Sequence, residues 1–139
     1  ALVRGAILAP ALLDYDFVAI SVLRIVLGLI FIGFAYLKFF RERPARIAFF
    51  EKLGMRPAVV FFGLVTGVEL LAGVLLVVGA FTQIAALVAG IIMTLATAIK
   101  IKRPEALPFN TLDFYIILAV ASFVMIFIGP GAFAVDLPL

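Results

Sequence analysis

The run "PAVVFFGLVTGVELLAGVLLVVGAFTQIAALVAGIIMTLATAI", Pro57 to Ile99, decides the fold because its 43 residues include a single charged side chain, Glu69. A helix rises about 1.5 Å per residue, so one helix of this length would reach about 64 Å, twice the bilayer core of about 30 Å. The run must fold back, and the turn-like stretch near its middle is "VVGAFTQIA", around Gly79–Gln83. It therefore predicts two membrane-spanning helices, at 57–79 and 82–100.

Two more apolar stretches predict spans at 17–40 and 111–128, the second followed by Gly-Pro-Gly at 129–131, a strong helix stop. Between the first two spans, residues 44–53 form a short amphipathic pattern typical of an interfacial helix, with a packed re-entrant loop as the alternative. The chain is 67% hydrophobic and 14% charged, whereas soluble domains are about 25% charged. We expect an all-α integral membrane four-helix antiparallel bundle, one domain over residues 1–139.

The composition also limits the chemistry of the chain. It contains no His, Cys or Trp and only three Met, whereas haem, iron–sulfur and zinc sites depend on His and Cys ligands. No nucleophile–base pair, phosphate loop or metal-ligand spacing is present. We therefore expect no metal-bound cofactor in this chain, and a quinone or a lipid is the candidate ligand.

The basic residues are unevenly placed, and this predicts an orientation. Nine of the eleven Lys and Arg lie in or beside two loops on one side: Lys38, Arg41, Arg43, Arg46, Lys52, Arg56, Lys100, Lys102 and Arg103. By the positive-inside rule these loops are cytoplasmic and both termini lie outside, in a multi-pass protein of a prokaryotic cell membrane. The net charge of +3 then reflects topology and anionic lipid headgroups, with no nucleic-acid partner. Residues 1–13 are expected to form an interfacial or partly inserted arm.

Helical spacing groups small and polar residues into one stripe per span. The predicted stripes are Arg24, Gly28, Phe31, Ala35 and Lys38; Phe62, Thr66, Glu69, Gly73 and Leu76; and Ala86, Gly90, Thr94 and Thr97. Asn110 is expected to cap the last span, with Asp113 three residues on.

Four ionisable residues form the candidate intramembrane polar site: Arg24, Lys38, Glu69 and Asp113. Arg24 and Glu69 differ in expected depth by about 5 Å, a gap that an Arg side chain spans, so we expect these two charges to pair. Lys38, Lys100 and Asp113 lie at similar depth and are expected to form a second polar cluster.

Each of these residues also has a simpler explanation. The Arg24–Glu69 pair is either a structural ion pair that fixes helix register or a site that binds a polar headgroup or relays a proton. Lys38 is explained by snorkelling to the interface, and Asp113 by helix capping alone. The sequence leaves these alternatives open.

Three stretches resemble the DoxX family in their order along the chain. They are "RIVLGLIFIGFAYLKFF" (24–40), "FFEKLGMRPAVVFFGLVTGVELLAGVLLVVGAFTQIAALVAGIIM" (49–93) and "TLDFYIILAVASFVMIFIGPGAFAVDL" (111–137). The family pattern falls on Arg24, Gly28, Gly33, Lys38, Glu69, Gly73, Gly79, Thr82, Asp113, Gly129, Pro130, Gly131 and Asp136. The ending "GPGAFAVD" departs from the more usual "GPG", basic residue, aromatic residue, "SLD".

The resemblance implies a four-helix membrane protein of redox-linked complexes. We therefore expect a membrane subunit of a quinone-linked oxidoreductase complex, an accessory subunit rather than an enzyme that acts alone. Its expected partners are membrane lipid and other membrane subunits of a redox complex, and any metal-based electron transfer would occur on those chains. The alternatives are a non-catalytic scaffold or assembly subunit, a lipid-binding subunit and, least favoured, a small-solute transporter.

Overall fold

The computed structural model describes residues 11, 15–106, 110–131 and 134, and within them the chain forms helices and no strands. Five α-helices and one short 3-10 helix follow in order: α1 (Asp16–Phe40), α2 (Arg43–Lys52), α3 (Ala58–Val78), α4 (Thr82–Lys102), η3 (Pro104–Ala106) and α5 (Leu112–Ile128). The bounds of the five α-helices agree with the predicted ranges to within two residues. The predicted arm at 1–13 lies outside the described residues, apart from Ala11.

The long helices have the length and surface of membrane spans. By length and composition α1, α3 and α4 can cross a bilayer, while α5 is apolar but only 17 residues long, near the lower limit for a span. Large apolar side chains face outward on these helices, including Leu64 (60% exposed), Ile117 (65%) and Phe127 (87%). A surface this apolar requires a lipid environment, so the predicted all-α membrane bundle is confirmed.

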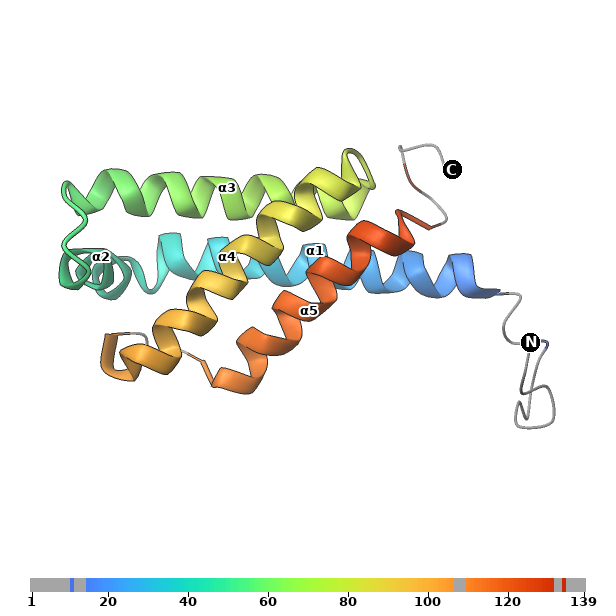
Figure 1. Ribbon diagram of the computed structural model, residues 1–139. Helices are drawn as coiled ribbons and strands as arrows, with labels where there is room; N and C mark the ends of the chain where they lie inside the picture. Colours follow the sequence, from blue (N-terminus) through green and yellow to red (C-terminus); the bar gives the residue numbers. More distant parts are fainter. Residues whose placement is uncertain (1–10, 12–14, 107–109, 132–133, 135–139) are drawn as a thin grey trace.

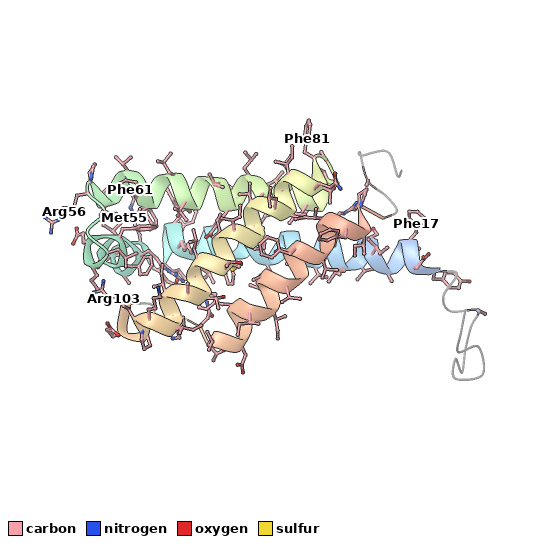
Figure 2. The ribbon with its side chains drawn as sticks, viewed as in Figure 1. Phe17, Met55, Arg56, Phe61, Phe81 and Arg103 are labelled. Atoms are coloured by element: carbon pink, nitrogen blue, oxygen red, sulfur yellow. The ribbon has the colours of Figure 1, made fainter. Side chains whose placement is uncertain are left out.

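The bundle consists of two antiparallel helix pairs. α1 packs along α3, and α4 packs along α5, with a smaller contact between α3 and α4. Figure 1 shows α4 and α5 running obliquely across the α1–α3 pair, with α2 at the end where α1 finishes and α3 begins. Figure 2 labels Met55, Arg56 and Arg103 at this α2 end, and Phe17 and Phe81 toward the opposite end.

Two facing glycines bring the backbones of α1 and α3 together. A Cβ atom on Gly28 would lie 2.7 Å from the Gly73 carbonyl oxygen, and one on Gly73 would lie 2.8 Å from the Gly28 carbonyl oxygen. Both distances are shorter than real Cβ contacts, so no larger residue fits at this crossing. Gly90 plays a similar part on α4, where an added Cβ would meet the ring of Phe123 at 2.7 Å.

The predicted stripes are largely the buried faces. On α1 the residues Arg24, Gly28, Phe31 and Ala35 are buried, and on α3 the whole predicted stripe from Phe62 to Leu76 is buried. The α4 stripe was only partly right, because Thr94 is exposed while Ala85, Ala89 and Met93 are buried. On this helix the buried face consists mainly of small residues, with Thr82 at its start and Met93 further along.

The helix ends differ slightly from the predicted ones. Gly79 ends α3 in the left-handed conformation (φ 74°), and both its N–H and that of Ala80 donate to the Leu75 carbonyl, as in a glycine-capped turn. The N-cap of α5 is Thr111, not Asn110, and its side chain makes no capping hydrogen bond. Asn110 instead points its amide toward the Tyr115 hydroxyl, at 3.5 Å.

The glycine crossing predicts a contrast between two substitutions on α3. Gly73→Ala should lower the free energy of unfolding by about 1–3 kcal/mol, because its Cβ forces the α1 backbone away. Gly67→Ala should leave stability unchanged or raise it slightly, since nothing lies within 4 Å of an added Cβ there and Ala favours helix. Thermal unfolding of both variants in the same detergent measures the difference, and equal effects would contradict this packing.

Candidate functional site

A buried ion pair joins α1 to α3. Lys38 Nζ lies 2.6 Å from Glu69 Oε1, and the two side chains are 13% and 0% exposed. Lys38 therefore turns inward to a carboxylate, which excludes snorkelling to the interface as its explanation. A charge-assisted hydrogen bond of this length offsets part of the cost of burying two charged groups in apolar surroundings.

The predicted pairing of Glu69 with Arg24 is therefore wrong, and side-chain direction explains why. Side chains on a helix lean toward its N-terminus. In an antiparallel pair, Glu69 on α3 leans toward the α2 end, where Lys38 on α1 leans back to meet it. Arg24 leans in the same direction as Lys38, toward the N-terminus of α1, and this takes its side chain away from Glu69 and toward Gly79 at the far end of α3. The expectation from depth alone compared Cα positions and left out this lean.

Arg24 belongs to a different structural feature, at the end of the bundle opposite α2. Its side chain is completely buried, and Nη1 donates a hydrogen bond of 2.8 Å to the carbonyl of Pro130, just after α5. Gly131 follows against the first turn of α1, where an added Cβ would lie 2.8 Å from the Phe17 carbonyl oxygen. Arg24 thus connects the first span to the segment that follows the last one.

The second predicted cluster, of Lys38, Lys100 and Asp113, does not form as expected. Lys38 is engaged with Glu69, and Asp113 is exposed in the first turn of α5. A carboxylate in that position interacts favourably with the helix dipole. Of the four predicted site residues, the structure brings together Lys38 and Glu69 and places Arg24 and Asp113 elsewhere.

A cavity of about 200 Å³ lies beside the Lys38–Glu69 pair. Most of its wall is aromatic or aliphatic, and α1, α2, α3 and α4 all contribute. The apolar lining residues are Phe34, Phe49, Phe50, Leu53, Met55, Phe62, Val65, Ile92, Met93, Leu95, Ala96 and Ile99. Leu95 is also 58% exposed, so the cavity lies next to the outer apolar face of α4.

The cavity also has polar lining residues, of which Thr66 and Glu69 lie near the middle of α3. Besides Lys38 and Glu69 they are Arg46, Thr66, Asn110 and Tyr115. Arg46 is 7% exposed and donates from Nε and Nη2 to Glu42 Oε2, at 3.0 and 2.8 Å. The cavity therefore combines an apolar wall with a few fixed donors and acceptors, the usual composition of a small-molecule site.

Helix α2 forms one wall of the cavity. Phe50 is 8% exposed and packs with Ala58 and Phe62 of the α3 segment, and Phe49 packs beside it. The amphipathic pattern at 44–53 had predicted the helix correctly, but much of its apolar side covers the cavity. Arg46, Asn110 and Tyr115 were missed as site residues, since only the folded chain brings them near Glu69.

The two oxygens of Glu69 are in different situations. Oε1 accepts from Lys38, whereas Oε2 is buried with no hydrogen-bond partner in the described part of the chain. An ionised carboxylate can accept about four hydrogen bonds and an ammonium group can donate three. The site can therefore offer a further acceptor on Glu69 and further donors on Lys38 to a small polar group in the cavity.

Metal binding has no support in the described residues, where no three Asp or Glu side chains gather as a metal site would require. What the cavity offers is hydrogen bonding and charge, together with an apolar wall for a ring or a hydrocarbon chain.

Comparison with known proteins gives one match. The family model described as DoxX matches residues 19–101, more than half of the chain, and this stretch includes Lys38, Glu69 and most of the cavity wall. No curated protein and no solved structure matches the sequence.

The ion pair predicts a specific pattern of stabilities. Lys38→Met should destabilise the protein by about 3–5 kcal/mol, because it leaves the Glu69 charge buried without its cation. Adding Glu69→Gln to that variant should recover much of the loss, since both charges are then gone. Thermal unfolding of the two single variants and the double variant gives the coupling energy.

The matched control is the pair Arg24→Met and Glu69→Gln. Glu69 precedes Gly79, the α3 neighbour of Arg24, by ten residues, or about 15 Å of helix. The effects of the two substitutions on the free energy of unfolding should therefore add. A coupling between Arg24 and Glu69 larger than that between Lys38 and Glu69 would contradict the assignment.

Proposed function

The chain belongs to the DoxX family, and on this premise we propose that it is a membrane subunit of a quinone-linked redox complex. The observation that supports this most directly is the cavity of about 200 Å³, apolar but for a few polar groups that include a buried Lys–Glu pair. The family, whose members are often linked to redox or stress-related roles, supports the same direction.

A quinone headgroup suits the chemistry of this cavity. Its ring is flat and apolar on both faces, which matches walls made of Phe34, Phe49 and Phe62. Its oxygens lie at the ring edge, where Lys38 can donate a hydrogen bond. Drug-sized ligands occupy sites of about 300–1,000 Å³, so this smaller cavity fits a headgroup and leaves the tail among the helices and lipid.

The redox centres of the complex are assigned to partner subunits. A quinone exchanges two electrons and two protons, and this chain has no His or Cys to hold a metal that could relay the electrons. In the proposal this chain binds and orients the headgroup and exchanges protons with it. Partner membrane subunits carry the haem, copper or flavin that exchanges electrons.

The proposal includes an orientation in the membrane. The α2 end of the bundle carries most of the basic residues, among them Arg41, Arg43 and Lys102, and the positive-inside rule assigns this end to the cytoplasm. The cavity would then lie nearer the cytoplasmic side of a prokaryotic cell membrane, with both termini outside.

Isolation from native membranes tests the function. We expect the tagged chain, purified in mild detergent, to retain a quinone detectable by mass spectrometry and to bring down subunits with haem, copper or flavin. Ala96→Phe should reduce the retained quinone at least about fivefold, because the ring fills the cavity that Ala96 lines. A loss of that size corresponds to about 1 kcal/mol of binding free energy.

Ala98→Phe is the matched control, since Ala98 is on the same helix but exposed, and it should retain quinone as the wild type does. Circular dichroism and gel filtration establish that both variants fold. A lone bundle that carries neither quinone nor redox partners would contradict the proposal and favour a scaffold or lipid-binding role.

Topology can be tested cleanly because the chain has no cysteine. With Lys102→Cys, a membrane-impermeant maleimide should label the protein only after the cells are permeabilised. With Phe81→Cys, at the exposed turn between α3 and α4 (66% exposed), it should label intact cells. The reverse pattern would invert the proposed orientation.

A further inference from the structure

We propose that this cavity selects the reduced, hydroxyl-bearing form of its ligand over the oxidised, carbonyl-bearing form, and that Glu69 Oε2 makes the selection. The inference rests on the proposed function, because it concerns the redox state of the headgroup that the cavity binds. It arises from a geometric observation: one oxygen of a completely buried carboxylate has no donor among the described residues.

In this proposal the donor to Oε2 comes from the cavity. Glu69 is one of the residues that line it, and the Lys38 ammonium group already occupies the other carboxylate oxygen at 2.6 Å. A buried acceptor without a donor is unfavourable, and more so when it is charged. A ligand that brings a donor to Oε2 therefore gains a hydrogen bond that no described residue provides.

The two redox forms differ in the group that they present to Oε2. A hydroquinone O–H donates to Oε2 while its oxygen accepts from Lys38, so it satisfies both members of the pair. A quinone carbonyl can accept from Lys38 but has no proton to donate, and its lone pairs would face the carboxylate. The Lys38–Glu69 pair is thus complementary to a hydroxyl group and only half complementary to a carbonyl.

The size of the selection follows from the hydrogen bond involved. Hydrogen bonds to charged groups are stronger than those between neutral groups. Their typical net contribution predicts that the hydroquinone binds about ten to a hundred times more tightly than the quinone.

Three ligands with one ring and one tail test the inference on the wild-type chain in lipid nanodiscs: a decyl-tailed benzoquinone, its hydroquinone, and the dimethyl ether of that hydroquinone. Equilibrium binding is measured without oxygen. We expect the hydroquinone to bind at least about tenfold more tightly than either of the others. The ether keeps the shape and the ring but has no donor, so it separates hydrogen bonding from ring electronics.

Glu69→Gln assigns the effect to this residue. A Gln amide can donate to a carbonyl as well as accept from a hydroxyl, so the hydroquinone and quinone affinities should come within about threefold of each other. Glu51→Gln removes an exposed carboxylate on α2 and should keep the wild-type ratio. If Glu69→Gln alone does not fold, the Lys38→Met and Glu69→Gln double variant replaces it.

The binding results distinguish an error in this inference from an error in the proposed quinone-binding function. Equal affinity for the three ligands, or tighter binding of the quinone, would overturn the inference and leave quinone binding in place. Failure to bind any of the three would overturn both. A hydroquinone preference that persists in the Glu69 variant would assign the selection to another group and also overturn the inference.

Discussion

The structure depends on one requirement: the Glu69 carboxylate, fully buried in an apolar bundle, must have a cation beside it. Lys38 meets that requirement at 2.6 Å, but only because α1 and α3 run antiparallel and almost in backbone contact. Gly28 and Gly73 make this approach possible, since neither position has room for a Cβ atom. The same two helices, α1 and α3, therefore both pair the buried charge and pack closely against each other.

The cavity follows from how the other helices meet this pair. The ion pair, which α1 and α3 hold in place, forms one part of the lining. The helix α4 and the short helix α2 contribute apolar residues to the rest. A polar group held on two rigid helices keeps its position, which a binding site requires. The protein thus combines a fixed donor and acceptor with a surface for a ring, and the family membership gives this combination a redox context.

Much of the fold was accessible from the sequence, but only half of the site. Membrane spans are set by apolar length and by turn residues such as Gly79, and both are local signals. The partner of Glu69 could not be predicted from the sequence. Arg24 and Lys38 are both basic residues on the predicted stripe of α1, and depth alone favoured Arg24. The choice depends on the lean of the side chains within an antiparallel pair. The cavity could not be predicted at all, since Arg46, Asn110 and Tyr115 reach it from separate segments.

The bond between Arg24 and the Pro130 carbonyl has a consequence for how the chain is made. During synthesis α1 emerges more than a hundred residues before Pro130, so this acceptor does not yet exist when the first span enters the membrane. This contact of the first span therefore forms only after the last span has been translated, which makes it one of the latest bonds of the bundle to close.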